Sequence, residues 1–244
     1  MIDYFSLLNE PRRPWLDADL LKQKFLTLSA SAHPDKIHSA SDADKADATK
    51  KFTELNAAFH CLAEPKSRLL HLLELERGAK PADIQQIPAA LADLFAEVAN
   101  SCRSADGFLV EKSKATSPLV QVQLFERGQD WVEKLNVLQR KLNELREKLT
   151  GELKLLDAQW VSADAAARRE ILPKLEELYR LFGYFNRWNN QIQERVVQLS
   201  FCFLLPFFKT RFHLPDFSRG LYSAHECDPG SQSQIQIQHA AVRG

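Results

Sequence analysis

Residues 33–36 carry the most informative chemistry in the chain, the run His33-Pro34-Asp35-Lys36. The Pro34 ring fixes its own φ and disfavours helical backbone at His33, so a preceding helix should end there and leave a stiff corner. His33 offers a ring donor and acceptor, and the Asp35 carboxylate accepts charge-assisted hydrogen bonds, best from an arginine. This chemistry suits contact with a partner protein. The alternative is that Asp35 merely caps the following turn of an ordinary His-Pro loop.

Elsewhere the sequence contains no enzyme signature. It lacks the glycine-rich phosphate-binding patterns, the His-Glu-x-x-His zinc motif and the Gly-x-Ser-x-Gly nucleophile turn. His33 and His38 have no cysteine or close set of carboxylates beside them to complete a metal site. His60 and His71 fall in helical stretches, where a histidine is more often a partly buried or surface residue than a ligand. We therefore expect no enzymatic activity, no metal and no cofactor.

Charge and cysteine content limit the kinds of partner and the cellular compartment that we expect. Thirty-two basic and thirty-two acidic residues give a net charge of zero, which removes any global electrostatic case for nucleic acid or an anionic membrane as the main partner. The four cysteines form no Cys-x-x-Cys pair, so neither a disulfide scaffold nor a zinc ribbon is expected, and a reducing cytoplasm is the natural compartment. We expect no signal peptide and no membrane span, because no window is apolar for long enough.

Two amphipathic helices should hold the His33 corner between them. Apolar residues recur every three or four positions at Leu21, Phe25, Leu28 and Ala32, and again at Ala48, Phe52, Leu55, Phe59 and Leu62. Asp17 and Asp19 suit the start of the first helix, and residues 41–44 form a variant of the capping box before the second. Faces of matching length predict an antiparallel pair. Pro65 suits the first position of a third helix, which should end at Gly78.

Beyond residue 78 the pattern loosens and then becomes regular. Residues 79–118 are interrupted by prolines and Gly107, which predicts a linker with one short docked helix. Residues 119–200 carry leucine and aromatic residues at steps of three, four or seven, a spacing typical of a coiled-coil seam. A turn at residues 162–164 predicts a long helical hairpin, whose second arm Pro173 should kink or interrupt.

The last segment, residues 201–244, differs from the rest. Six of the fifteen phenylalanines fall between Phe201 and Phe217, after which the chain becomes polar with no period. This composition predicts a poorly ordered tail. The alternative is a docking segment for a partner or a membrane surface.

The helix pair and its corner resemble the J domain of DnaJ-type co-chaperones. Phe25 and Leu28 precede His33 by the distances at which that family has an aromatic residue and a leucine. Further matches indicate the HscB branch, the J proteins of iron–sulfur cluster assembly: Asp3-Tyr4-Phe5, Leu55-Asn56-Ala57-Ala58-Phe59, Pro65, Arg68, His71-Leu72-Leu73, Leu75 and Gly78. The resemblance covers about the first 78 residues. Beyond them it is architectural, because HscB also ends in a helical bundle.

This resemblance implies a chaperone-binding site. In the J family the His-Pro-Asp corner contacts a DnaK-class or HscA-class ATPase and stimulates ATP hydrolysis by that partner. The residues implied here are His33, Pro34, Asp35, Lys22, Lys24 and Lys36. Two departures weaken the pattern, because Leu26, Thr27 and Ser31 occupy positions where the family usually has cations, and Ala32 replaces an aromatic residue. Residues 1–78 hold eleven basic and twelve acidic side chains, so electrostatic steering should be weak.

The resemblance also implies a client-binding surface. HscB proteins hold the cluster scaffold with an apolar and acidic patch on the helix after the J domain. The nearest counterpart here is Leu91, Asp93, Leu94, Phe95 and Glu97. The alternative is that the three apolar residues of this set simply face the core.

Taken together, these patterns predict an all-α protein with four parts. They are a J domain at 1–78, a linker with a short docked helix at 79–118, a client-binding helical hairpin or three-helix bundle at 119–200, and a tail at 201–244. The predicted function is that of a co-chaperone which stimulates a DnaK/HscA-class ATPase and delivers the iron–sulfur cluster scaffold. Two alternatives are a J protein for another client, and a coiled-coil scaffold with an inert J-like domain if the leucine seam pairs between chains.

Overall fold

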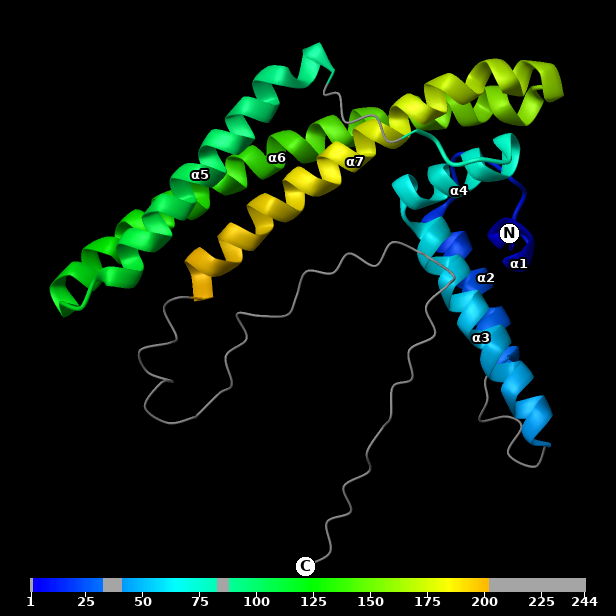
Figure 1. The fold of residues 1–244 in the computed structure, drawn as a ribbon, viewed down its shortest axis with the longest axis horizontal. Helices are drawn as coiled ribbons and strands as arrows, with labels where there is room; N and C mark the ends of the chain where they lie inside the picture. The colour runs from blue at the N-terminus through cyan, green and yellow to red at the C-terminus, as the bar shows by residue number, and fades with distance from the viewer. Residues whose placement is uncertain (1, 33–40, 83–87, 202–244) are drawn as a thin grey trace, which may run out of the picture. The chain divides into compact units, whose positions relative to one another are not determined.

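The structure is a computed structural model that describes residues 2–32, 41–82 and 88–201 (Figure 1). All of these residues fall in one compact unit, Met1–Phe203. Within the described ranges every regular element is a helix and no strand is present, which confirms the predicted all-α class. The predicted tail lies outside the described residues except for Phe201.

Four helices make up the amino-terminal part; the first was not predicted, and the bounds of the other three are close to those predicted. They are α1 (Tyr4–Leu7), α2 (Ala18–Ser31), α3 (Asp42–Ala63) and α4 (Pro65–Arg77). The Asp17 side chain accepts from the backbone N–H groups of residues 19 and 20, which fixes the start of α2. Pro65 opens α4, and Gly78 closes it with a φ of 73°, a left-handed conformation that favours glycine. These local signals account for why the helix ends were predictable.

Three long helices follow the amino-terminal part and pack together. They are α5 (Ala92–Lys114), preceded by the 3-10 turn η2 (Ala89–Leu91), α6 (Pro118–Ser162) and α7 (Ala165–Phe201). Each of the three contacts the other two, so the predicted three-helix bundle is present. The expectation of a short helix within residues 79–118 is wrong, because α5 has 23 residues. Its buried face recurs at Leu94, Val98, Cys102, Ala105 and Phe108, and this packing offsets the cost of Gly107 in the helix.

The leucine seam is buried within the chain. Leu135, Leu138 and Leu142 of α6 pack with Phe185, Trp188 and Ile192 of α7 in one apolar cluster. Each such side chain contributes about 1.5–3 kcal/mol when it leaves water. Because the two halves of the seam belong to one chain, the hairpin does not need a second copy to bury it.

Helix α7 runs through Pro173 without interruption, so of the predicted kink or interruption the second does not occur. Pro173 removes one backbone donor, but the side chain is exposed and the helix buries Leu172 and Leu175 on either side of it. Packing of these neighbours keeps the helix continuous where sequence propensity alone would end it.

A second apolar cluster joins the amino-terminal helices to α6 and α7. It contains Leu69, Leu72 and Leu73 of α4 together with Leu153 and Trp160 of α6, and Leu175, Leu178 and Phe182 of α7. Two polar links accompany it: Asn186 donates to the Glu64 carboxylate at 2.8 Å, and Arg77 pairs with Glu176. The two parts of the described chain therefore share a core.

Residues 12–15 form the most densely hydrogen-bonded contact between these parts, which we call the clasp. Asp157 of α6 is 3% exposed, and its carboxylate accepts from the Arg13 guanidinium and from the Trp15 backbone N–H at 3.1 Å. Trp160 Nε1 donates to the Arg12 carbonyl at 3.0 Å. The hydrogen bond from Arg13 to Asp157 raises the pKa of that guanidinium above its ordinary value, so Arg13 is charged at neutral pH.

The clasp is held from its other side by Arg68 of α4, which is 3% exposed. Arg68 donates to the Pro14 carbonyl at 2.8 Å and to the Leu62 carbonyl at 2.5 Å. Burial lowers the pKa of Arg68 to about 10, which still leaves the guanidinium protonated near neutral pH. A buried arginine with carbonyl partners on two segments fixes the course of the chain between α1 and α2.

We predict that Asp157→Asn destabilises the protein by about 2 kcal/mol, because the half-buried Arg13 guanidinium then faces a neutral amide in place of the buried Asp157 carboxylate. The measurement is the free energy of unfolding from urea denaturation. The control is Glu133→Gln, which removes an exposed ion pair with Arg140 and should change stability by no more than about 0.5 kcal/mol. Equal midpoints for the two variants would contradict the role assigned to the clasp.

Candidate functional site

The His33-Pro34-Asp35-Lys36 run lies outside the described residues, but both helices that border it are described. Helix α2 ends at Ser31, and the Ala32 N–H donates to the Leu28 carbonyl at 3.1 Å. The predicted end of the helix just before His33 is therefore confirmed. Residues 33–40 connect this end to the start of α3.

A capping box fixes the far side of this connection. The Ser41 hydroxyl accepts from the Asp44 N–H at 3.2 Å, and the Asp44 carboxylate accepts from the Ser41 N–H at 3.3 Å. Both bonds of the box are present, as the sequence predicted. The chain therefore enters α3 in a set direction after residue 40.

The two helices pack side by side and in opposite directions (Figure 1). Phe25 of α2 stacks on Phe59 of α3 with ring centroids 4.4 Å apart. Leu21 and Leu55 are buried on the same faces. The residues whose period predicted the pair are thus the ones that hold it together, and they anchor both ends of residues 33–40.

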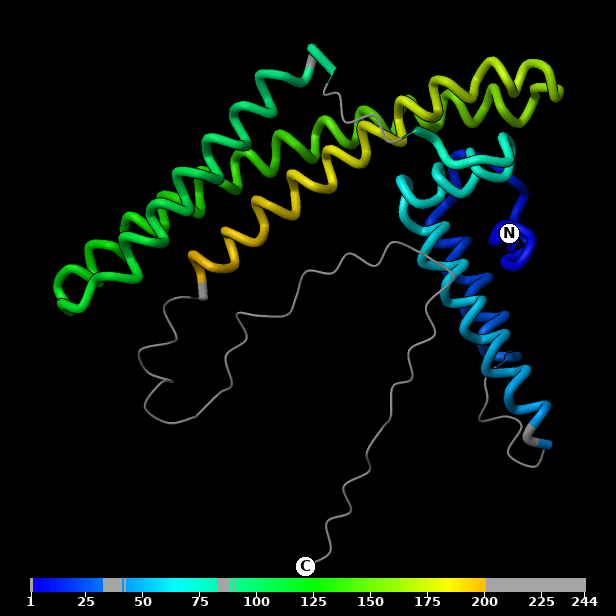
Figure 2. Tube along the Cα trace, in the orientation of Figure 1, coloured from blue at the N-terminus to red at the C-terminus, as the bar shows by residue number. Residues whose placement is uncertain are grey.

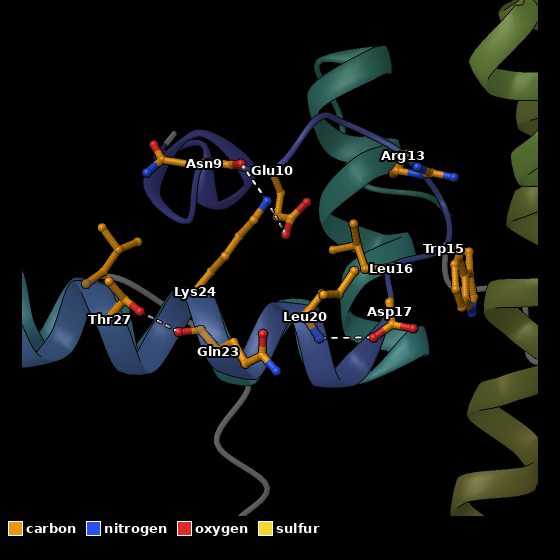
Figure 3. Close-up of a pocket in the computed structure, with 11 residues that line it drawn as sticks. Asn9, Glu10, Arg13, Trp15, Leu16, Asp17, Leu20, Gln23, Lys24 and Thr27 are labelled. Carbon is orange, nitrogen blue, oxygen red and sulfur yellow. Dashed lines mark hydrogen bonds and ion pairs between the residues drawn. The ribbon is translucent and has the colours of Figure 1, made fainter.

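The two predicted lysines of α2 have different surroundings. Lys22 is exposed on the helix surface. Lys24 reaches back to the segment after α1, where its Nζ donates to the Asn9 carbonyl at 3.0 Å and pairs with the Glu10 carboxylate at 2.8 Å (Figure 3). Lys24 therefore ties α2 to the preceding turn. Sequence reasoning missed Glu10, because nothing local connects it to a lysine 14 positions later.

A cavity of about 530 Å³ lies beside Lys24, between the segment 9–17 and α2 (Figure 3). Trp15, Leu16, Leu20 and Leu28 give it apolar walls. Its main polar groups are already engaged, since Asp17 caps α2 and Glu10 pairs with Lys24. The cavity therefore has no set of acid, base and nucleophile that could perform catalysis.

His71 of α4 contacts the first helix of the chain. Its Nε2 accepts a hydrogen bond from the Tyr4 N–H at 3.1 Å, and its ring lies 4.6 Å from the Tyr4 ring and 5.8 Å from the Phe5 ring. Burial lowers the pKa of this imidazole; the Asp3 carboxylate opposes the shift and Arg12 adds to it. An imidazole that accepts at Nε2 must be neutral, so the lowered pKa and the hydrogen bond agree.

The five residues predicted to bind a client lie at the start of α5 but do not form one surface. Leu94 is buried against the bundle core and Leu91 is half-buried beside it, so these two follow the inward-facing alternative. Phe95 is 43% exposed, and its ring lies 6.2 Å from the Trp188 ring. Asp93 and Glu97 are exposed, and Glu97 pairs with Lys141 of α6 at 2.5 Å.

Two further searches concern only the described residues. No group of three or more histidine, cysteine, aspartate or glutamate side chains in this part of the chain is arranged to hold a metal ion. In the same ranges no helix combines the length and the apolar run needed to cross a bilayer.

Comparison with known proteins gives matches to HscB co-chaperones. The chain is 38% identical over 73 residues to the co-chaperone protein HscB homolog of Chromobacterium violaceum, a stretch that covers 30% of this chain and 42% of that protein. It is 37% identical over 73 residues to the HscB homolog of Azoarcus sp. strain BH72, covering 30% and 41%. The match thus spans about two fifths of the length of these curated relatives. No model of a known protein family matches the chain.

The fold extends the likeness beyond that stretch. The crystal structure of human co-chaperone protein HscB superposes with a TM-score of 0.52 at 18% identity, and the aligned part covers 80% of this chain and 82% of the human one. At this identity the superposition concerns the fold alone. The resemblance to HscB co-chaperones indicated by the sequence is therefore confirmed.

We predict that the His71 hydrogen bond makes stability depend on pH. The pKa of His71 is lower in the folded chain than the value near 6.5 expected on unfolding, so the unfolded chain binds more protons in this range. The contribution of His71 is therefore complete above about pH 7 and declines as the pH falls through 6.5 toward the lowered pKa.

The variant His71→Gln retains an acceptor and cannot titrate, so its free energy of unfolding should change less between about pH 7 and pH 5 than that of the parent chain. The control is His60→Gln, which removes an exposed imidazole from α3 and leaves the Tyr4 bond intact. If His71→Gln and the parent chain follow the same pH profile, His71 is not the group responsible.

Proposed function

We propose that the chain is a J-type co-chaperone of the HscB kind, which stimulates a DnaK/HscA-class ATPase through His33, Pro34 and Asp35 and brings it a client. The observation that carries the proposal is the position of this tripeptide in the sequence, directly after α2 and shortly before α3. The 38% identity to an HscB homolog over 73 residues supports it. Residues 1–78 act as the J domain in this proposal.

The corner acts by recognition and performs no chemistry of its own. The Asp35 carboxylate is an acceptor for an arginine of the ATPase, and the His33 ring can bond to backbone groups of the same partner. Because α2 and α3 are paired through Phe25 and Phe59, both ends of the connection are anchored before the partner arrives. Less conformational freedom is then lost on binding, which favours the complex.

The cations of α2 contribute unequally in this proposal. Lys22 is exposed and can attract an acidic surface of the ATPase. Lys24 is largely committed to Asn9 and Glu10, so its main role is to hold the turn after α1 against α2. Since residues 1–78 carry one more acidic than basic side chain, long-range attraction is weak and binding relies on short-range contacts.

The proposed client is the scaffold protein of iron–sulfur cluster assembly, bound at the start of α5. Phe95 supplies an exposed ring, and Asp93 and Glu97 supply charge near it. An aromatic side chain bordered by carboxylates suits a partner surface with an apolar pocket and basic groups. Leu94 supports this surface from the core and is not available for contact.

The proposal predicts that the full chain accelerates single-turnover ATP hydrolysis by an HscA-class chaperone. His33→Gln and Asp35→Asn should each reduce this stimulation about tenfold or more, because each removes a hydrogen bond to a charged or desolvated partner group. The matched control is His38→Gln, the same substitution within the same connection, which should stimulate like the parent chain. Equal stimulation by the His33 and His38 variants, or none by the parent, would rule the proposal out.

Binding of the scaffold protein tests the client surface separately. The double variant Asp93→Lys, Phe95→Ser should raise the dissociation constant about tenfold or more, measured by titration calorimetry. The control is Glu152→Lys, Leu155→Ser, which makes the same kinds of change at exposed positions of α6. If the first variant binds as tightly as the control, the client surface lies elsewhere, while the ATPase measurement still tests the J domain.

A further inference from the structure

The outward side of helix α2 carries little charge and two exposed leucines. After Leu20 the exposed charged side chains of this helix are Lys22 and Lys24, and Lys24 is paired with a carboxylate of the preceding turn. Leu20 is 57% exposed and Leu26 is 55% exposed. A single exposed leucine is ordinary on a protein surface. Leu20 differs from Leu26 because it also lines the cavity beside α2.

This cavity offers mainly apolar contact. Its volume of about 530 Å³ lies within the range of pockets that enclose a ligand. The apolar walls come both from the segment before α2 and from α2 itself: Trp15, Leu16, Leu20 and Leu28. The charged residues that line it all have partners already: Glu10 with Lys24, Arg13 with Asp157, and Asp17 with backbone N–H groups of α2. A group that enters the cavity therefore gains chiefly from leaving water.

Two contacts hold the walls in place before any partner binds. The Trp15 backbone N–H donates to the Asp157 carboxylate at 3.1 Å, which fixes one wall to α6. Lys24 Nζ donates to the Asn9 carbonyl at 3.0 Å, which fixes the turn after α1 to α2 (Figure 3). Less conformational freedom is lost when a partner enters a preformed cavity, so more of the apolar gain is available for binding.

The charges near the cavity do not select a partner of either sign. The exposed charged residues closest to Leu20 along α2 are Asp19 and Lys22, one acidic and one basic. Residues 1–78 as a whole carry one more acidic than basic side chain. Long-range attraction is therefore weak, and burial of apolar surface is the main contact that this region provides.

The cavity lies on the helix that leads to the residues proposed to bind the ATPase. Helix α2 runs along α3 and ends at Ser31 (Figure 2). Leu28, which lines the cavity, precedes His33 by five residues. Leu20 lies about 16 Å from the end of α2, at 1.5 Å per residue. A standard interface covers about 800 Å² on each partner, or about 30 Å across, so one protein can contact both places.

We infer that this cavity receives an aliphatic or aromatic side chain of the ATPase. The inference rests on the proposed function, because the ATPase is the protein that this function places at the far end of the same helix. Continuity along α2 thus identifies the occupant. The cavity supplies through desolvation the short-range affinity that a domain without a basic field needs. The chain accordingly selects an ATPase that presents an apolar group to the start of α2.

The test compares two leucines of one helix. Leu20→Gln removes an apolar side chain from the cavity. Leu26→Gln is the matched control, because Leu26 has nearly the same exposure but lies about 120° around the helix from Leu20 and does not line the cavity. The measurement is single-turnover ATP hydrolysis by an HscA-class chaperone at increasing concentrations of the full chain. It gives the maximal stimulation and the concentration for half of it.

Leu20→Gln should raise the half-maximal concentration about fivefold, because less apolar surface is buried in the complex. Its maximal stimulation should equal that of the parent, since residues 33–35 are unchanged. Leu26→Gln should match the parent in both quantities. Thr27→Trp, which fills the cavity with an indole, should act like Leu20→Gln even though it adds apolar surface. Leu20 and Thr27 are exposed, so these changes do not threaten folding.

Ionic strength gives a second readout. The half-maximal concentration of the parent should rise less than about threefold between about 0.05 and 0.3 M potassium chloride, because apolar contacts are not screened by salt. A larger rise would contradict the inference, since charges would then dominate the binding.

The outcomes separate the inference from the proposed function. If the parent does not stimulate the ATPase, the proposed function fails and the inference fails with it. If the parent stimulates and His33→Gln does not, but Leu20→Gln and Leu26→Gln have equal half-maximal concentrations, only the role of the cavity is wrong. A dimer of the parent that Leu20→Gln converts to a monomer would also overturn it, because a second copy would then be the occupant.

Discussion

The buried carboxylate of Asp157 links helix α6 to the segment that precedes α2. It accepts from the Arg13 side chain and the Trp15 backbone, and Arg68 binds the Pro14 carbonyl between them. Three consecutive residues are thus held from α6 on one side and α4 on the other. Helix α2 begins at Ala18, three residues after Trp15, so this contact helps to set the direction of the helix. The contact adds a polar link to the apolar core that the amino-terminal helices share with α6 and α7.

Most charged side chains singled out in the amino-terminal part bind other groups of the same chain. Asp17, Asp44 and Glu64 cap helices, Glu10 neutralises Lys24, and His71 must stay uncharged. Few basic side chains are left to attract an acidic partner, because Lys24 is paired with Glu10. If the chain binds an ATPase as proposed, few charges are left for long-range attraction, so recognition would rest on shape and directed hydrogen bonds and would be less sensitive to ionic strength.

The helix ends and the paired faces of α2 and α3 could be predicted because their causes are local. A cap such as Ser41 with Asp44, or a stop such as Gly78, depends on residues a few positions apart. The length of α5 could not be predicted in this way. Gly107 indicates a helix end when only the sequence is considered, and the helix continues because Phe108 packs in the core. The division of the client patch into buried Leu94 and exposed Phe95, and the pairing of Arg13 with Asp157, also depend on contacts between distant segments. The residues 33–36 that suggested the function are not among those the structure describes.

The continuity of helix α6 sets the relative orientation of two distant contacts. It is one uninterrupted element of 45 residues that carries Lys141, the partner of Glu97 beside the proposed client surface, and Asp157, which binds the segment before α2. One residue added between these two positions would turn one site about 100° around the axis relative to the other. Lengthening is therefore compatible with both contacts only in steps close to whole numbers of turns, such as seven or eleven residues, with α7 extended to match. The helix fixes the phase of the two sites as well as their separation.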